Sequence, residues 1–353
     1  MFPKVIYLIF TLFLLGCEPA NIHLEHMSPS LEHVVDDLDA NKANNLHSLI
    51  VWQDGQTLLE LYRTAPGRER DYKTPALTVG VDKLHNLHSV TKSFVATLVF
   101  IAIDEKKIAG LDQPVFSFYP EYQESDLEGK MTITVGDLLN MSSGFPLNEL
   151  IGDTYQTTAN HFNRHYLAKD LDQLMFDLDV VFEPGSKFSY SGFSTVILSR
   201  IVERAYDGQP FTRLMKDKLF TPLGITHYEW MSHQGSSVAG ADWGLRLTSR
   251  DLLKFGQLYL ERGKWKGHTV FSERWITHVA SPAFGLYPSS YGMHFWQPSL
   301  IQNSYAAIGI GEQYVIIIPS KKSVIVATGG NYDAGNPTLK YLSTLESHLE
   351  SKR

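Results

Sequence analysis

The hydrophobic and polar positions of this 353-residue chain follow two different periods, and each period predicts its own elements. Residues 47–63, HSLIVWQDGQTLLELYR, form two β-rich runs around Asp54-Gly55, which is typical of a two-residue type I′ hairpin. Near the C-terminus, YAAIGIGEQYVIIIPSKKSVIVATGG gives two further β-rich runs joined by residues 319–322. We expect these first and last strands to share one antiparallel sheet.

Other segments space their apolar residues as helices do. They are residues 89–103, 205–225, 246–265 and 337–351. The third of these has Thr248 or Ser249 as its cap and Asp251 in its first turn. Because helices and turns dominate between about 110 and 235, the pattern predicts an α/β (α+β) fold. It would consist of an antiparallel sheet flanked by helices, plus an inserted, mostly helical lobe.

The first residues, MFPKVIYLIFTLFLLGC, carry one lysine and then an apolar run that is too short to span a bilayer but suits a signal peptide. The stretch from Leu14 to Cys17 resembles the lipobox of bacterial lipoprotein precursors. We therefore expect residues 1–16 to be removed and Cys17, the only cysteine, to carry lipid. The alternative is a plain secretory signal with an incidental cysteine.

The lipobox resemblance implies a bacterial cell-envelope protein that faces the periplasm, anchored to a membrane through its N-terminus. Glu18 follows the cysteine and weakly favours the outer membrane. We expect residues 17–46, which are polar and compatible with a helix, to form an N-terminal linker and helix.

Composition narrows the function classes. Hydrophobic residues make up 43% of the chain and aromatic residues 12%, which is ample for a large core. The net charge of -7 offers no basic stripe, so we expect no nucleic-acid partner. The absence of G-x-S-x-G removes the α/β-hydrolase alternative, and no glycine-rich phosphate loop follows a strand. We expect no cofactor.

The one S-x-x-K of the chain, Ser89-Val90-Thr91-Lys92, stands at the start of the 89–103 helix. A helix N-terminus favours developing negative charge, and Lys92 lies one turn on, on the same face. Apolar surroundings can lower the pKa of a lysine enough for it to activate a serine. The competing interpretation is a serine N-cap with a solvated lysine.

Six stretches of the chain, the first of which contains Ser89 and Lys92, follow one another in a recognisable order. They are LHSVTKSFVATLVFIAI, KIAGLDQPVFSFYPEY with ITVGDLLNMSSGF, FEPGSKFSYSGFSTVILSRIVE, PLGI, GLRLTSRDLLKFGQLYLERGKW and AAIGIGEQYVIIIP. From about residue 82 onward the chain resembles the penicillin-recognising serine hydrolases: class C β-lactamases, D,D-peptidases, β-lactamase-related esterases and 6-aminohexanoate-dimer hydrolases. The resemblance implies that residues 47–353 form a β-lactamase/penicillin-binding-protein-like hydrolase domain, with the helical lobe at about 110–235.

The same resemblance implies three catalytic residues. Ser89 would be the acylated nucleophile, Lys92 its proton partner, and Tyr190 the second-motif tyrosine that shuttles a proton to the leaving group. Many relatives continue with Tyr-x-Asn, whereas this chain has Gly192, which cannot offer a side-chain amide to a substrate carbonyl. The substrate-binding contact at Gly192 is therefore absent or comes from elsewhere.

The third motif departs further from the family pattern. Its slot falls at Ala307-Ile308-Gly309, which has no cation and no hydroxyl where β-lactam-hydrolysing relatives hold a substrate carboxylate. Ile310 would complete the oxyanion hole with Ser89, unless Gly311 is the motif glycine. We expect Glu312 to be a solvent-facing loop carboxylate rather than a catalytic group. His233-Gln234-Gly235 has the form His-x-Gly, but it precedes the helix that begins near Thr248 and not the last strand. We therefore do not take it as the third motif.

Four histidines lie where they could carry chemistry. His161 and His165 are four residues apart, but no H-E-x-x-H occurs, so we expect no metal site. His85 and His88 flank the nucleophile, and packing is the favoured role for both.

Two function classes remain. The first is an exported serine hydrolase that cleaves a small-molecule ester, amide or peptide through an acyl-enzyme on Ser89, with esterase or amidase activity favoured over β-lactamase activity. The second is a catalytically inactive relative that binds peptidoglycan or a protein partner. The intact set of Ser89, Lys92 and Tyr190 favours the enzyme.

Overall fold

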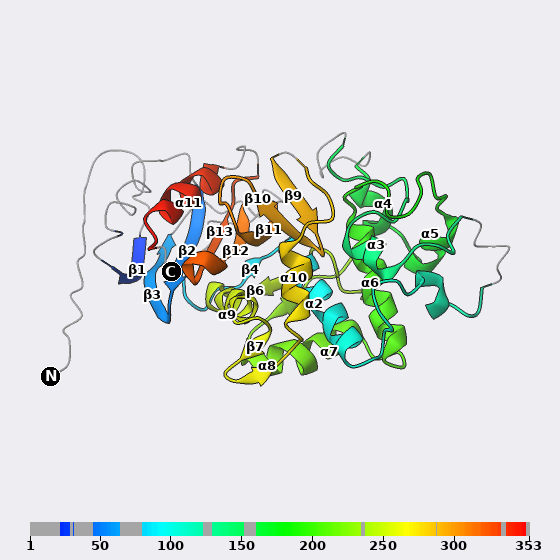
Figure 1. Ribbon diagram of the computed structural model, residues 1–353, viewed down its shortest axis with the longest axis horizontal. Helices are drawn as coiled ribbons and strands as arrows, with labels where there is room; N and C mark the ends of the chain where they lie inside the picture. The colour runs from blue at the N-terminus through cyan, green and yellow to red at the C-terminus, as the bar shows by residue number, and fades with distance from the viewer. Residues whose placement is uncertain are drawn as a thin grey trace.

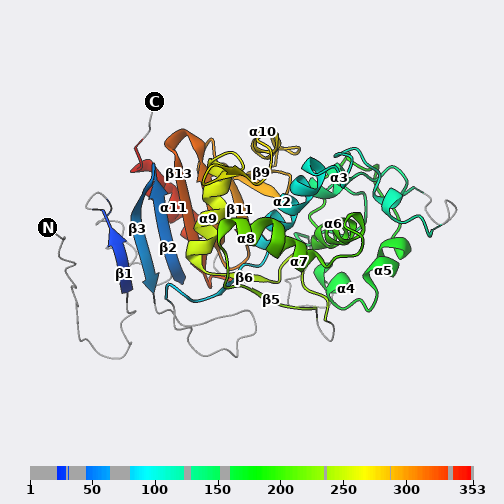
Figure 2. The same cartoon turned by 90° about the horizontal axis from the view of Figure 1, so that it is seen from below.

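The computed structural model describes residues 22–28, 31, 45–63, 80–122, 129–151, 160–233, 237–286, 288–332 and 337–350. A large sheet with helices on both faces forms one half of the molecule, and a helical lobe forms the other (Figure 1). The N-terminal strands and the C-terminal helix lie together at the sheet end, while the lobe is made of the middle of the chain (Figures 1 and 2).

The large sheet has eight strands in the order β1-β3-β2-β13-β12-β11-β10-β9, and all pairs are antiparallel. The strands are β1 (Ile22–Met27), β2 (Leu46–Gln53), β3 (Gln56–Arg63), β9 (Ser289–Gly292), β10 (Phe295–Pro298), β11 (Tyr305–Gly309), β12 (Gln313–Ile318) and β13 (Ser323–Gly329). The pairing of β2 with β13 confirms that the first hairpin and the last strands share one sheet. Asp54 and Gly55 both have positive φ, as a type I′ turn requires.

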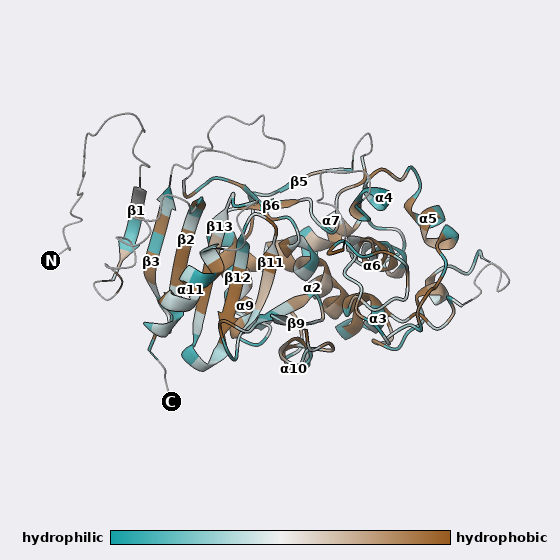
Figure 3. Cartoon of the chain, turned by 90° about the horizontal axis from the view of Figure 1, so that it is seen from above, coloured by the Kyte–Doolittle hydropathy of each residue, from teal (hydrophilic) through white to brown (hydrophobic). Residues whose placement is uncertain are grey.

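Alternating side chains of the inner strands feed two cores. Val324 and Val326 of β13 belong to the core that contains α9 (Ser249–Leu260) and α2 (Val90–Asp104). Ile325 and Ala327, one residue out of step, face the core of α11 (Pro337–Ser347) on the opposite side. The inner strands are therefore apolar on both faces, which Figure 3 shows as brown along the strands.

The lobe comprises short helices around one long helix, α6. Around α6 (Gly192–Ala205) lie η2 (Val115–Phe118), α3 (Val135–Leu139), α4 (Phe162–Tyr166), α5 (Leu171–Asp177) and α7 (Phe211–Met215). The helices η4 (Lys216–Phe220) and α8 (Thr221–Leu223) follow α7 along the chain. The described residues between 115 and 223 are therefore mostly helical. Helix α2 is buried along almost its whole length because it packs against both α6 and β11, between the two halves (Figure 2).

Smaller elements complete the fold. They are β4 (His85–Asn86), β5 (Glu229–Trp230) and β6 (Leu245–Leu247) in one sheet, β7 (Lys264–Trp265) with β8 (His268–Thr269) in another, η5 (Pro319–Lys321), and α10 (Arg274–Ala280). The side chain of Thr248 accepts from the Asp251 N–H, so Thr248 is the cap of α9. Pairing of β4 with β6 fixes the segment that leads into Ser89.

One expectation for the N-terminal region is wrong. Residues 22–27, which fall in the expected linker and helix at 17–46, form the edge strand β1 on β3. Their sequence, IHLEHM, alternates apolar and polar residues at first, and the unpaired edge of β3 stabilises an extended chain there. The signal peptide and Cys17 lie outside the described residues. No helix of the described part is long and apolar enough to cross a membrane.

Candidate active site

Ser89 lies at the N-terminus of α2 and is partly exposed, whereas every residue that follows it in the first three turns is buried. Its hydroxyl makes no capping hydrogen bond. The preceding residue, His88, has a φ of 47°, a left-handed conformation that non-glycine residues seldom adopt. This bend sets Ser89 at the helix end, and the interpretation of Ser89 as a simple polar cap is wrong.

Lys92 lies one turn into α2 and is only 2% exposed, so it is not a solvated lysine. Its Nζ donates to the Ser89 Oγ at 3.0 Å and to the main-chain oxygen of Asp242 at 2.9 Å. Burial lowers the pKa of Lys92, but the Tyr190 phenol oxygen and the carboxylates of Asp242 and Glu149 outweigh it, and the net pKa is raised. The expected lowering is therefore wrong, because the surroundings are anionic and not only apolar.

Tyr190 ends the extended segment before α6 and is 4% exposed. Its hydroxyl lies within hydrogen-bonding reach of both Ser89 and Lys92. Burial raises the pKa of Tyr190, and the Lys92 ammonium opposes that rise without cancelling it. The structure thus brings together the three side chains that the sequence singled out, with a neutral phenol and an ammonium at rest.

Aromatic side chains surround the Tyr190 ring. Tyr291 and Trp296 lie with ring centroids 5.8 and 5.6 Å away, and Phe188 lies at 6.4 Å. Phe188 and Trp296 are partly exposed, so they present an apolar surface beside the phenol. Contacts of this kind fix the ring by packing and leave the hydroxyl for hydrogen bonding.

The end of β11 approaches the nucleophile from the sheet. A Cβ on Gly309 would lie 2.3 Å from the main-chain oxygen of Leu87, two residues before Ser89. Only glycine permits this approach, which agrees with Gly309 as the glycine of the third motif. Ile310, partly exposed, follows it in the turn between β11 and β12. Gly311 instead packs against the ring of Tyr332.

Glu312 is 2% exposed, so the expectation of a solvent-facing carboxylate is wrong. Its carboxylate accepts from the N–H of Thr338 at 2.7 Å, from the Thr338 hydroxyl and from Asn331. Burial raises the pKa of Glu312, and these hydrogen bonds limit the rise. Because Thr338 is in the first turn of α11, Glu312 ties the turn after Gly309 to that helix.

Gly192 does not face an open substrate cleft. Its N–H donates to the Glu149 carboxylate at 2.5 Å, and a Cβ there would lie 2.1 Å from the carboxylate of Asp242. Asp242 in turn accepts from His165 Nε2 at 3.1 Å, assuming the tautomer protonated there. No motif in the sequence points to Glu149 or Asp242, and His165 stands out only as a partner of His161. The one signal for the group is the glycine at a position where relatives carry a polar side chain.

These three residues each offer a metal-ligating atom within 4.8 Å of the others. The two carboxylates act on the Lys92 ammonium, which donates to the Asp242 main-chain oxygen. His161 takes no part: its Nδ1 accepts from the Asn148 N–H. The pairing of His161 with His165 as ligands is therefore not supported.

The histidines beside the nucleophile pack as expected. His85 is buried, and burial lowers its pKa to about 3. The His88 Nε2 lies 3.0 Å from the hydroxyl of Tyr332. His88 therefore ties the turn before Ser89 to Tyr332.

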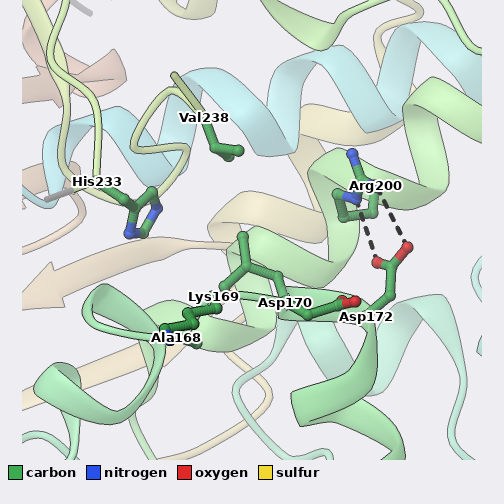
Figure 4. Close-up of a pocket in the computed structure, with 8 residues that line it drawn as sticks. Ala168, Lys169, Asp170, Asp172, Arg200, His233 and Val238 are labelled. Carbon is green, nitrogen blue, oxygen red and sulfur yellow. Dashed lines mark hydrogen bonds and ion pairs between the residues drawn. The ribbon is translucent and has the colours of Figure 1, made fainter. Parts of the chain in front are cut away.

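A cavity of about 150 Å³ lies between residues 168–172, Arg200 and His233. His233 stands on one side of it, and the ion pair of Arg200 with Asp172 on the other (Figure 4). Its lining contains no serine, cysteine or tyrosine, so it is separate from the nucleophile. Residues 234 and 235 of the His-x-Gly sequence lie outside the described residues.

Comparison with known proteins identifies the family of the chain. The family model described as Beta-lactamase matches residues 31–339. A 6-aminohexanoate-dimer hydrolase from Paenarthrobacter ureafaciens is 26% identical over 262 residues, which cover 69% of this chain and 66% of that protein. Penicillin-binding protein 4 from Amycolatopsis lactamdurans is 28% identical over 243 residues, covering 61% and 59%.

Among solved structures, a family VIII carboxylesterase superposes with a TM-score of 0.69 at 17% identity, over 93% of this chain and 100% of that one. At this identity the likeness establishes the fold alone. The match to the curated relatives spans 38% to 66% of their lengths.

Proposed function

The chain belongs to the beta-lactamase family of serine hydrolases, and from that premise we propose that it cleaves an ester or amide through an acyl-enzyme on Ser89. The observation that carries this proposal is the buried group around the nucleophile. Lys92 lies 3.0 Å from the Ser89 Oγ, and the Tyr190 hydroxyl is within reach of both. Such a set supplies a nucleophile and a positioned proton acceptor.

In the proposed reaction the pair of Lys92 and Tyr190 first loses one proton, which leaves a phenolate beside an ammonium. The phenolate takes the Ser89 proton as Oγ bonds to the substrate carbonyl carbon and the carbonyl electrons move onto oxygen. The phenol then gives that proton to the leaving alcohol or amine as the scissile bond breaks. Water, deprotonated by Tyr190 in its turn, releases the acid and restores Ser89.

The negative oxygen of the intermediate would be bound by the N–H groups of Ser89 and Ile310. Support comes from the contact of Gly309 with the Leu87 carbonyl, which holds the end of β11 beside the start of α2. The dipole of α2 adds to this stabilisation, since its positive end lies at Ser89.

We propose esters and neutral amides as substrates in preference to β-lactams. Residues 307–309 provide no cation for a substrate carboxylate, and the Gly192 N–H is occupied by Glu149. Loss of one charge-assisted hydrogen bond costs about 1.5–3 kcal/mol, or roughly ten- to a hundredfold in kcat/KM. The partly exposed Phe188 and Trp296 favour apolar substrate groups beside Tyr190.

The test is kcat/KM for p-nitrophenyl butyrate against nitrocefin on one preparation, with Ser89→Ala as the blank. We expect the ester to be the better substrate by at least about tenfold. Nitrocefin turnover equal to or above that of the ester would refute the selectivity. No turnover of either, nor of short amide oligomers, would instead favour a binding protein.

We also propose that the mature protein is exported and lipid-anchored through Cys17. The support is sequence alone: a lone cysteine after a short apolar run with Leu-x-Gly before it. Cys17→Ser should release soluble or unprocessed protein from membranes of a Gram-negative host. If this variant fractionates as the wild type does and no acylated N-terminal peptide is found, the anchor is wrong.

A further inference from the structure

Three ionisable side chains from three separate segments meet in the interior, and two of them, the carboxylates of Asp242 and Glu149, act on Lys92. Glu149 comes from the loop after α3, His165 from α4 and Asp242 from the segment before β6. All three are buried, and His165 and Asp242 have no exposed side-chain surface. A buried charge is costly unless it is paired, so a cluster of this kind needs a purpose or a counter-charge.

The cluster occupies the space that a side chain at position 192 would fill. A Cβ on Gly192 would lie 2.1 Å from Asp242 Oδ2 and 3.0 Å from Glu149 Oε1. The two carboxylates can therefore flank the backbone of residue 192 only because it is glycine. The absence of a polar side chain at position 192 and the presence of the two carboxylates therefore go together, because the carboxylates fill the space that such a side chain would need.

We propose that Glu149, His165 and Asp242 form a positioning cluster that replaces the absent side chain at position 192 and holds the Lys92 ammonium against Ser89. This inference rests on the proposed function, in which Lys92 and Tyr190 serve Ser89. The three residues touch no reacting atom and act through Lys92 and Tyr190.

The contacts show how each member acts. The Asp242 main-chain oxygen accepts from Lys92 at 2.9 Å, and His165 fixes the same residue through its carboxylate at 3.1 Å. Glu149 is held by the Gly192 N–H, and its own N–H donates to the Tyr190 carbonyl oxygen at 2.8 Å. The cluster thus sets the position of Lys92 from one side and of the Tyr190 segment from the other.

Charge gives the cluster a second effect. The groups that face Lys92 are Tyr190, Asp242 and Glu149, with His294 nearby, a histidine that Lys92 and burial keep neutral. Asp242 stays ionised, since His165 and Lys92 outweigh burial and lower its pKa to about 2. Both carboxylates raise the pKa of Lys92, so they stabilise the protonated state of the Lys92–Tyr190 pair.

The experiment measures the rate of Ser89 labelling by a fluorophosphonate from pH 5 to 10, in wild type, Glu149→Gln and Asp242→Asn. Both variants keep the hydrogen-bonding shape and remove one negative charge. Glu60→Gln is the matched control, because Glu60 is a buried carboxylate in β3 that pairs with Arg250 and Tyr62. Circular dichroism and a denaturation midpoint establish that each variant is folded.

We expect the acid limb of the labelling rate to move to lower pH by about one unit or more in Glu149→Gln and Asp242→Asn, and to stay in place in Glu60→Gln. A folded Glu149→Gln with an unmoved limb would overturn the inference, even if its rate were lower. If Asp242→Asn does not fold, Glu149→Gln decides, since its amide oxygen can still accept from Gly192. If neither variant folds, the wild type decides. An acid limb of its labelling rate with a midpoint below pH 7 would overturn the inference.

Two further outcomes test the proposed function and the identity of the cation separately. Wild type that is not labelled at Ser89 at any pH would refute the proposed function itself. Labelling that is lost on dialysis against EDTA and regained with added Zn²⁺ would assign the cluster to a metal ion, and would also overturn the inference. Labelling unchanged by EDTA supports Lys92 as the cation that the cluster holds.

Discussion

Substitution of Gly192 by alanine tests the packing of the carboxylate cluster most sharply. The new Cβ would lie 2.1 Å from Asp242 Oδ2, whereas ordinary contact starts at 3.4 Å, so the carboxylate must move. Asp242 is fully buried and bonded to His165, and it cannot move without breaking that hydrogen bond or displacing α4.

The expected cost follows from three terms. Overpacking of a tight interior costs about 1–3 kcal/mol, and a lost charge-assisted hydrogen bond about 1.5–3 kcal/mol. Restriction of the unfolded chain by alanine returns about 0.4–1 kcal/mol. We therefore expect Gly192→Ala to lower the free energy of unfolding by about 2–5 kcal/mol, a large part of the stability of an ordinary domain.

Urea denaturation followed by tryptophan fluorescence measures this difference. The control is Gly110→Ala, since a Cβ there meets nothing within 4 Å and the backbone φ is not positive. We expect the control to change stability by less than about 0.5 kcal/mol. A Gly192→Ala protein as stable as the control would refute the crowding of residue 192 by Asp242 and Glu149.

Three further predictions concern the catalytic group and the core. Tyr190→Phe should keep the fold, because the ring still packs on Tyr291 and Trp296. It should lower kcat for p-nitrophenyl butyrate by about 10²- to 10⁴-fold. A loss of less than tenfold would show that Tyr190 does not transfer the proton. The pKa values of Lys92 and Tyr190 are both raised, so the base forms only as the pH rises. We therefore expect kcat/KM to increase from pH 7 to pH 9. A profile that is flat over this range would contradict the role of this pair as the base. Stability should fall as pH drops below 6.5, because His47, His85 and His294 are buried and neutral with pKa values lowered to about 4, 3 and 3, whereas the unfolded chain binds these protons near pH 6.5. The slope from the three histidines is up to about 4 kcal/mol per pH unit, and thermal melting at pH 7 and pH 5 checks it; an equal or higher Tm at pH 5 would count against it.

Local signals in the sequence were sufficient for the elements that carry the site. The apolar run after Ser89 predicts α2 because that helix is buried on all sides, and Asp54-Gly55 predicts the first hairpin because both residues accept positive φ. The trio of Ser89, Lys92 and Tyr190 follows from motif resemblance, and the fold brings it together. In β1, the initial apolar and polar alternation of IHLEHM was visible, but only the unpaired edge of β3 decides that it forms a strand.

Interactions between distant segments could not be predicted in this way. His165 and Asp242 are 77 residues apart, and neither stands in a recognisable motif. Glu312 lies in a turn, where a carboxylate usually faces solvent, and its burial depends on Thr338, 26 residues later. The direction of the Lys92 pKa shift depends on the same long-range contacts, since burial alone would lower it.

The central claim is that Ser89 is the nucleophile of this hydrolase, and mass spectrometry of fluorophosphonate-treated protein tests it most directly. Wild type should gain the mass of one adduct, and peptide analysis should map it to Ser89 and to no other serine. Ser89→Ala should gain no adduct and lose ester turnover. Ser93→Ala should still be labelled at Ser89, because the wild-type Ser93 hydroxyl is bonded to the His294 carbonyl oxygen. An adduct that persists in Ser89→Ala, or that maps to another residue of the wild type, would contradict the account.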